Sequence, residues 1–232
     1  MKRSLIDKSR LKSKKLLLVG LFFGLSSGSA LAGTIENSVH DFRTYNWTGQ
    51  GGQICIVCHT PHHAQDGATA PLWNHEITTA TFQMYESTSF DGAATRETGP
   101  TGASKMCLSC HDGTVALDSF GANIPSGGAP LGADSRRNVG TDLRNDHPIS
   151  FKYDTALSQA DPGLFDPTTK EVTIGQGADS KPGTIATVML EGGDTLQCST
   201  CHDVHNKFAI DQTPLLRVDI AGSKLCLTCH NK

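Results

Sequence analysis

Hydrophobic residues are spread very unevenly along this chain of 232 residues. One apolar run spans residues 16–25, and beyond it long segments with a helical or strand period are missing. Residues 112–146 and 155–185 are rich in Gly, Pro, Asp, Ser and Thr, which predicts loops. The pattern therefore predicts mostly irregular chain with short helices and few short strands.

A few short stretches carry local patterns of their own. Residues 104–111 and 223–230 predict single helical turns, and residues 79–87 predict a short helix. Residues 171–174 and 184–190 predict strands. These elements are too short to build a conventional side-chain core.

The apolar run belongs to a three-part N-terminal segment. Seven Lys and Arg residues precede it, and a stretch rich in small residues follows it and ends Ala30-Leu31-Ala32. This order is typical of a secretory signal peptide, and the run is too short to span a bilayer. We expect residues 1–32 to be removed, leaving a mature chain that begins at Gly33; a retained membrane anchor is the alternative.

Removal of this segment changes the charge of the protein. Residues 1–32 hold 7 of the 20 Lys and Arg residues and one of the 23 Asp and Glu residues, so the mature 200 residues have 13 basic and 22 acidic side chains and a net charge of −9. The mature chain has no basic stripe of the kind that binds nucleic acid. Partners with positive patches, cations or metal oxides fit this balance better than nucleic acid.

All eight cysteines fall into four copies of the pattern Cys-x-x-Cys-His. This spacing is the attachment signature of c-type haem, in which two thiols bond to the porphyrin and the adjacent imidazole binds the iron. We therefore predict four covalent haem c groups. The residues that would hold them are Cys55, Cys58 and His59; Cys107, Cys110 and His111; Cys198, Cys201 and His202; and Cys226, Cys229 and His230.

Two other uses of paired cysteines explain less of the pattern. Structural zinc sites use two Cys-x-x-Cys pairs, but they do not account for a histidine after every pair when the chain has 10 histidines in all. Disulfides likewise give these histidines no role. With haem, the large apolar porphyrin faces replace the missing core, since burial is worth about 25 cal/mol per Å². The expected fold class is a multihaem cytochrome c, organised around four stacked covalent haems.

The four motifs alternate between two types. The A motifs, at Cys55 and Cys198, continue to a further histidine three residues later; the B motifs, at Cys107 and Cys226, share the surrounding pattern Ser-Lys-x-Cys-Leu-x-Cys-His. The order A-B-A-B indicates two dihaem modules, about 33–150 and about 151–232. Stacked modules would align the haems into a chain.

Histidines outside the motifs decide what the irons can do. Methionine alternatives are few, because Met1 leaves with the signal peptide and Met106 abuts Cys107, so that Met84 and Met189 remain. The candidate distal ligands are His40, His62, His75, His147 and His205. Four irons need four distal ligands, so one of these five histidines is surplus unless a neighbouring chain takes part. His63 is an exposed neighbour of His62 or its substitute.

Two imidazoles on each iron favour electron transfer over catalysis. Histidine in place of methionine gives a low reduction potential, and an iron with six ligands has no open position for a substrate. A multihaem oxyanion reductase would need an altered site, such as lysine in place of a motif histidine, and all four motifs end in histidine. We expect an electron-transfer protein and not an enzyme.

One known family carries the same combination of motifs. The chain resembles the multihaem c-type cytochromes of metal-reducing bacteria over nearly all of its mature length, and among them it is most similar to outer-surface tetrahaem cytochromes that polymerise into extracellular filaments. The stretches that carry this resemblance are Val39-His40-Asp41, Cys55-Ile56-Val57-Cys58-His59-Thr60-Pro61-His62, Pro71-Leu72-Trp73-Asn74, Cys107-Leu108-Ser109-Cys110-His111-Asp112-Gly113, Asp146-His147-Pro148 and the two C-terminal motifs.

The resemblance implies bis-histidine haems in a closely stacked chain, head-to-tail self-association and a place on the outer cell surface. It implies periplasmic or outer-membrane cytochromes as electron donors and extracellular acceptors such as metal oxides. In such filaments a histidine just after the first motif can ligate a haem of the next subunit, and the matching position is His62. The alternative is a monomeric periplasmic electron shuttle, which shares this chemistry and differs in assembly.

Overall fold

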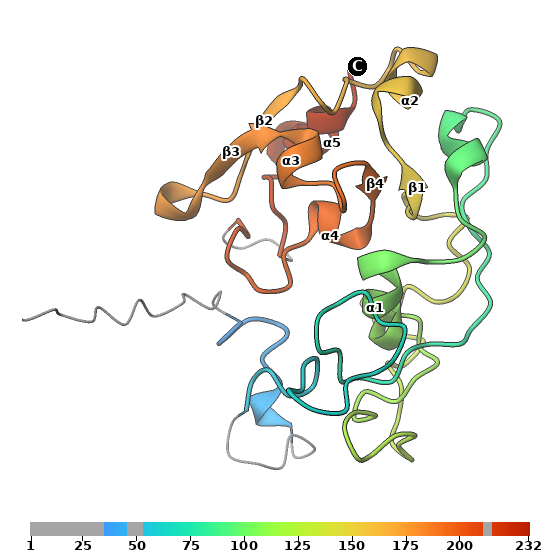
Figure 1. Ribbon diagram of the computed structural model, residues 1–232, viewed down its shortest axis with the longest axis vertical. Helices are drawn as coiled ribbons and strands as arrows, with labels where there is room; N and C mark the ends of the chain where they lie inside the picture. Colours follow the sequence, from blue (N-terminus) through green and yellow to red (C-terminus); the bar gives the residue numbers. More distant parts are fainter. Residues whose placement is uncertain (1–34, 46–52, 211–214) are drawn as a thin grey trace, which may run out of the picture. The chain divides into compact units, whose positions relative to one another are not determined.

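A computed structural model of the chain describes residues 35–45, 53–210 and 215–232 (Figure 1). The predicted signal peptide, residues 1–32, lies outside these ranges. Within them, no helix has the length and apolar character that crossing a membrane requires. Most of the described chain is irregular, with short helices and few short strands, as the sequence predicts.

Regular elements are concentrated in the second half of the chain. The N-terminal part contributes the short 3-10 turns η1 (Phe42–Thr44) and η3 (Asp91–Thr95) and the helix α1 (Gly102–His111). The remaining elements are β1 (Phe151–Lys152), α2 (Thr155–Ala160), β2 (Glu171–Ile174), η4 (Gly177–Asp179), β3 (Lys181–Thr184), α3 (Ile185–Val188), β4 (Thr195–Leu196), α4 (Cys198–Cys201), η5 (Ala221–Ser223) and α5 (Lys224–Cys229).

The strands form two small antiparallel pairs. β1 pairs with β4, so that Phe151 lies opposite Leu196. β2 and β3 form a hairpin closed by η4, in which Glu171 lies opposite Thr184. Two-stranded pairs of this size are marginal on their own, so their stability depends on side-chain packing.

Two small clusters of buried hydrophobic side chains form the core of the described residues. The smaller cluster includes Leu108 of the second motif, and the larger one packs against Cys229 of the fourth. Met84 and Met189, the methionines that remained as alternative iron ligands, are buried in these clusters as packing groups. The smaller cluster is Phe82, Met84, Leu108 and Leu143; the larger is Phe151, Tyr153, Leu157, Ile174, Ile185, Val188, Met189, Leu190 and Leu196.

The prediction of a helix over residues 79–87 is wrong. This stretch is extended, and burial alternates along it: Phe82 and Met84 are buried whereas Thr81 and Gln83 are exposed. The Gln83 carbonyl accepts a hydrogen bond from the Leu143 N–H at 2.8 Å. The alternation has a period of two, which is the period of an extended chain packed on one side.

Other predicted elements are partly confirmed. The strand predicted at 171–174 is β2, and the helical turns predicted at 104–111 and 223–230 correspond to α1 and to η5 with α5. The strand predicted at 184–190 is wrong, because the Thr184 hydroxyl accepts a hydrogen bond from Thr187 N–H and caps α3. The loop predicted at 155–185 is also wrong, since it contains α2, β2 and β3, whereas 112–146 has no described helix or strand.

A buried tyrosine provides a test of this core. The Tyr153 hydroxyl, on a residue that is 1% exposed, donates to the Phe165 carbonyl at 2.6 Å. We expect Tyr153→Phe to lower the free energy of unfolding by about 1–2 kcal/mol, because the carbonyl loses its partner in the interior. Urea unfolding measures this change. The control is Tyr85→Phe, whose half-buried side chain packs on the Phe90 ring; an equal loss in both variants would contradict the assignment.

Candidate functional site

Each Cys-x-x-Cys-His motif folds as a turn of helix. The histidine N–H donates to the carbonyl of the first cysteine in the first, third and fourth motifs, at 2.8, 3.0 and 2.9 Å respectively, and the second motif lies inside α1. Residues four apart lie on the same side of a helical turn. The local fold therefore directs the first thiol and the imidazole of each motif towards one side.

The thiols are free; Cys55 and Cys226 are exposed and the other six cysteines are half-buried. The structure forms no disulfide among the eight cysteines, all of which lie in the described residues. Burial raises the pKa of Cys58 and of Cys201 to about 11 and that of Cys229 to about 12, so these thiols stay protonated at neutral pH. The thiols of Cys107 and Cys198 influence each other's pKa, which rises for Cys107 and falls for Cys198, so the second motif lies beside the third.

Three motif histidines face a histidine from elsewhere in the chain. The pairs and the distances between their ring centres are His111 with His40 at 6.0 Å, His59 with His205 at 6.2 Å, and His230 with His147 at 6.4 Å. The angle between the two ring planes is 20° in the pair of His59 with His205 and 72° in the other two pairs.

These distances match two ligands on one metal ion. An imidazole nitrogen lies about 2.0 Å from a metal that it binds and the ring centre roughly 1.1 Å farther out, so imidazoles on opposite sides of a metal have ring centres about 6.2 Å apart. Among the described residues, no three His, Cys, Asp or Glu side chains converge as ligands of a metal ion. A haem iron needs two ligands from the protein, because the porphyrin supplies four.

Hydrogen bonds at Nδ1 prepare the rings for coordination through Nε2. His59 Nδ1 lies 2.7 Å from the Pro71 carbonyl, His111 Nδ1 lies 2.7 Å from the Arg137 carbonyl, and His147 Nδ1 lies 2.9 Å from the Pro148 carbonyl. A carbonyl accepts only, so each Nδ1 carries the proton and each Nε2 keeps its lone pair. This is the tautomer of metal-bound histidine.

His40 is held neutral. Burial, and then the charges of His111, Arg137 and His202, lower the pKa of His40 to about 4. Its Nδ1 is buried and has no hydrogen-bond partner. A metal ligand must be unprotonated, and a buried polar atom without a partner is destabilising. The neutral ring therefore fits an iron ligand opposite His111.

The remaining three candidate histidines have different surroundings. His62 and His63 are exposed, and the Thr60 hydroxyl donates to the His62 carbonyl at 2.8 Å. His75 is fully buried; its Nδ1 lies 2.9 Å from the Glu76 carbonyl and its Nε2 lies 3.5 Å from Cys110 Sγ. Both ring nitrogens of His75 are therefore engaged within the chain, whereas the His62 ring is accessible to another molecule.

The A motifs belong to longer repeated units, A1 (residues 55–75) and A2 (residues 198–218). In A1 the Thr60 N–H donates to the Leu72 carbonyl; the matching bond in A2 joins Asp203 and Leu215, and both measure 2.8 Å. Leu72 and Leu215 have φ of 55° and 58°.

Further contacts repeat in the same register. His59 bridges to Trp73 as His202 bridges to Leu216. His63 and its counterpart Asn206 share a φ of 57°. The sequence analysis did not predict that the repeat extends beyond the motifs to residues 75 and 218, although a Pro-Leu pair recurs at the matching positions in both units.

Two buried aspartates position the loops that follow the motifs, and sequence reasoning missed them also. Asp203, 6% exposed, accepts hydrogen bonds from His205 N–H at 3.1 Å and from Phe208 N–H at 2.6 Å. Asp112, 4% exposed, accepts from the Thr78 hydroxyl. The signal was present, since each aspartate directly follows a motif histidine. Asp203 thereby holds the backbone of the histidine that faces His59.

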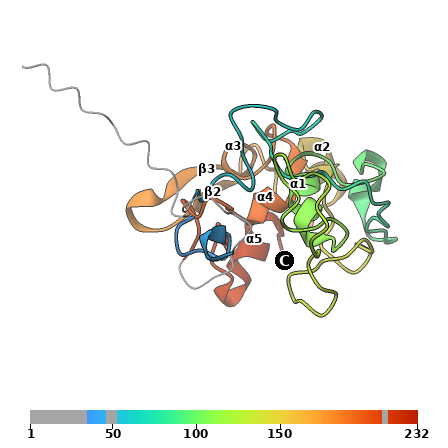
Figure 2. The same ribbon diagram turned by 90° about the horizontal axis from the view of Figure 1, so that it is seen from below.

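A buried polar network joins α1 to α4, which lie side by side in Figures 1 and 2. The Ser104 hydroxyl accepts a hydrogen bond from Cys198 N–H at 2.9 Å. The Ser150 hydroxyl donates to Gln197 Oε1 at 3.1 Å and accepts from Thr101 N–H at 3.0 Å. Because Ser104, Ser150 and Gln197 are at most 2% exposed, these bonds fix the second motif against the third.

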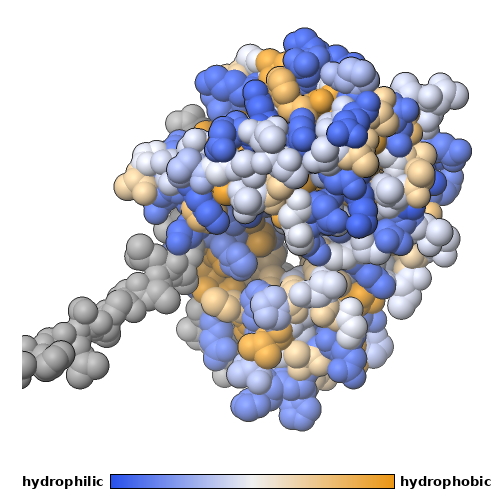
Figure 3. Space-filling model, turned by 45° about the horizontal axis from the view of Figure 1, so that its top comes forward, coloured by the Kyte–Doolittle hydropathy of each residue, from blue (hydrophilic) through white to orange (hydrophobic). Residues whose placement is uncertain are grey.

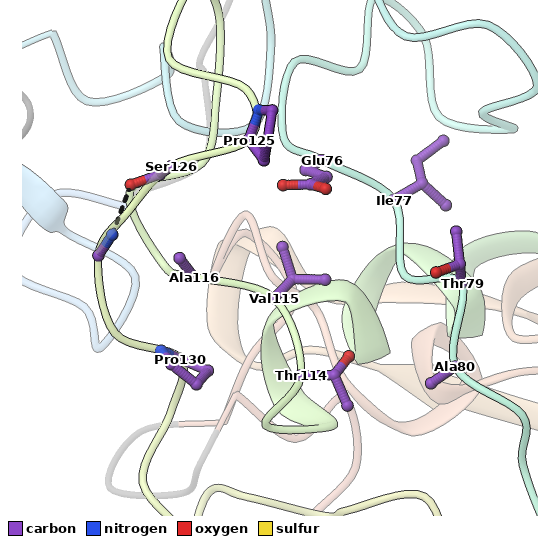
Figure 4. Close-up of a pocket in the computed structure, with 11 residues that line it drawn as sticks. Glu76, Ile77, Thr79, Ala80, Thr114, Val115, Ala116, Pro125, Ser126 and Pro130 are labelled. Atoms are coloured by element: carbon purple, nitrogen blue, oxygen red, sulfur yellow. Dashed lines mark hydrogen bonds between the residues drawn. The ribbon is translucent and has the colours of Figure 1, made fainter.

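One cavity of the described chain contains no motif residue. A cavity of about 410 Å³ is lined by loop residues including Glu76, Val115 and Ser126 and by no motif residue (Figure 4). Hydrophobic side chains line a hollowed part of the face drawn in Figure 3. The chemistry therefore gathers at the motifs and the histidine pairs, and not in the cavity of Figure 4.

No protein-family model matches this chain, and no curated protein matches it.

The contact between α1 and α4 can be tested with a matched pair of serines. We expect Ser104→Ala to lower the free energy of unfolding by about 1–2 kcal/mol, because Cys198 N–H loses its acceptor. Ser223 occupies the same position in the other B motif but is exposed, so Ser223→Ala should change stability by less than about 0.5 kcal/mol. Denaturant unfolding compares the two; equal effects would contradict a structural role for the Ser104 hydroxyl.

Proposed function

We propose that this protein transfers electrons through four covalent c-type haems, one at each Cys-x-x-Cys-His motif. The observation that carries the proposal is the spacing of the three histidine pairs, 6.0–6.4 Å between ring centres. Each pair joins one motif histidine to one of the distal candidates. Neither a zinc site built from cysteines nor a disulfide would explain why these histidines face each other. Bound haem supplies an iron that accepts and releases one electron.

The chain's own residues then have distinct roles. Cys55 and Cys58, with the corresponding cysteines of the other motifs, anchor the porphyrins, and His40, His205 and His147 complete the coordination opposite His111, His59 and His230. Two imidazoles per iron exclude a substrate from the metal and favour a low reduction potential. The role is that of an electron carrier and not of an enzyme.

The repeated A units support a polymeric assembly. His205 of the second module faces His59 of the first, and His62 is its counterpart in A1. If the relation between successive modules continues from one molecule to the next, His62 of one copy faces the motif histidine His202 of another. Both side chains are exposed. A head-to-tail contact of this kind does not close on itself, so it builds a filament.

We place this filament on the outer cell surface, after export directed by residues 1–32. Periplasmic or outer-membrane cytochromes would supply its electrons, and external acceptors such as metal oxides would receive them. The resemblance to filament-forming tetrahaem cytochromes supports this placement, as does the acidic balance of the mature chain. His75 lies against Cys110 of the second motif, and it is the fifth candidate for the four distal positions.

Haem content and spin state test the chemistry. Protein expressed with a c-type haem attachment system should carry four covalent haems, all low-spin, by mass spectrometry and optical spectra. His205→Ala should turn one of the four haems high-spin, because the iron at His59 loses its second imidazole. His63→Asn is the matched control, since Asn206 stands at the same position in A2, and its spectrum should not change. Colourless protein without added mass would contradict the proposal.

Assembly is tested separately with His62. We expect His62→Ala to abolish filaments in electron micrographs and to leave one high-spin haem per subunit, whereas His63→Asn keeps both filaments and spectrum. Unchanged filaments with every iron six-coordinate in His62→Ala would rule out ligation between subunits. Wild-type protein that remains monomeric with four low-spin haems would instead indicate a periplasmic electron shuttle.

A further inference from the structure

The three histidine pairs differ in how their rings are turned. The ring planes of His59 and His205 lie 20° apart, close to parallel, whereas the planes in each of the other two pairs lie 72° apart, close to perpendicular. Two imidazoles on opposite sides of one iron share an axis through the metal, so this angle describes how one ring is turned relative to the other about that axis. Orientation therefore distinguishes the first motif from the second and the fourth, although all three pairs have the same ligand type.

The orientation of the His59 ring is fixed by contacts from elsewhere in the fold. The torsion that turns a histidine ring has broad minima, so the local chain defines the ring plane only loosely. His59 Nδ1 lies 2.7 Å from the Pro71 carbonyl. The ring also meets the indole of Trp73 edge to face, with ring centres 6.2 Å apart and ring planes at 90°. Together these two contacts prevent the imidazole from turning.

Trp73 is held firmly in its own position. It is 9% exposed, its backbone bridges to that of His59, and its carbonyl accepts a hydrogen bond from Gln65 N–H at 2.7 Å. In unit A2 the same backbone bridge joins His202 to Leu216, an aliphatic residue without a planar ring. The aromatic contact at the first motif is therefore an addition to the backbone that the two units share.

We propose that Trp73 is a positioning residue that holds the His59 ring parallel to the His205 ring, and that this orientation gives the haem at the first motif a lower reduction potential than the haems at the second and fourth motifs. This inference rests on the proposed function. Low-spin ferric iron has a vacancy in a pair of d orbitals that receive electron density from the imidazoles. Parallel rings raise the energy of the same orbital, which then holds the vacancy, so the oxidised state is stabilised. Perpendicular rings raise both orbitals alike and give no such preference.

The perpendicular pairs are held by contacts of their own. His111 Nδ1 lies 2.7 Å from the Arg137 carbonyl. The facing ring of His40 packs edge to face on Phe42, with ring centres 5.8 Å apart and ring planes at 84°. At the fourth motif, the Nδ1 contact of His147 with a backbone carbonyl fixes one ring of the pair. The difference in angle between the pairs therefore follows from the fold around each histidine.

Electron paramagnetic resonance of the oxidised protein tests which haem has parallel ligands. Parallel imidazole planes give a rhombic low-spin signal, whereas perpendicular planes give a low-spin signal with a much larger g anisotropy, because the two d orbitals are then nearly equal in energy. We expect His205→Ala to remove a rhombic signal and His40→Ala to remove a strongly anisotropic one. Removal of a strongly anisotropic signal by His205→Ala would overturn the inference.

Trp73→Leu tests the positioning role, since Leu216 shows that leucine fits this position of an A unit. The released His59 ring should turn, so the rhombic signal should move towards larger anisotropy while all four haems stay low-spin. The midpoint of that haem should rise by an amount equivalent to about a fivefold change in the reduction equilibrium, about 40 mV for a one-electron couple. Trp73→Phe keeps a flat ring against His59 and should restore the wild-type signal and midpoint.

Phe90→Leu is the matched control, because it removes a half-buried aromatic ring that packs on Tyr85 and Phe151. It should leave every signal and midpoint unchanged. Four bound haems whose signals and midpoints in Trp73→Leu equal those of Phe90→Leu would overturn the inference while the proposed function stands. If Trp73→Leu does not fold, the spectra of His205→Ala and His40→Ala decide the question by themselves. Wild-type protein without haem would overturn the proposed function itself.

Discussion

The distance between facing imidazoles is the constraint on which the other features of the site depend. Two rings can bind opposite sides of one metal only if their centres are about 6.2 Å apart, and a displacement of an ångström at either ring would break one bond. The ring centres of the three pairs in this chain lie 6.0–6.4 Å apart, although the two histidines of each pair come from different segments of the chain. Distant loops must therefore be held with the precision usually supplied by long helices.

Polar contacts supply that precision here. Backbone carbonyls hold the rings of His59, His111 and His147 at Nδ1, and the buried Asp203 holds the backbone at His205. The network around Ser150 then joins the second motif to the third. Buried polar groups of this kind must be fully satisfied, and once satisfied they specify a single arrangement. The two hydrophobic clusters are small and pack against motif residues, so they support the sites without forming a separate core.

Repetition gives the chain its organisation, and departures from repetition distinguish the motifs at which we propose that haem binds. Units A1 and A2 share their hydrogen bonds and their left-handed residues, so their histidines are equivalent by geometry as well as by sequence. Against this common backbone, a cation at Arg217 replaces the amide of Asn74, and Leu216 replaces Trp73. A chain of otherwise similar irons can be tuned by such changes without altering the ligands.

The sequence by itself determined the four Cys-x-x-Cys-His motifs and their local geometry. The distances from one thiol to the next and to the imidazole are fixed within a single helical turn, so they do not depend on the rest of the fold. The lack of long periodic segments likewise determined that the chain is mostly irregular. Tertiary structure decided which imidazole faces which: His205 faces His59 of the first motif because distant segments of the chain pack together. Tertiary structure also decided that residues 79–87 are extended, because Gln83 pairs with Leu143, far along the chain. A contact between distant residues does not produce a periodic pattern of hydrophobic positions in either segment, so it cannot be predicted from the sequence pattern and is seen only in the folded chain.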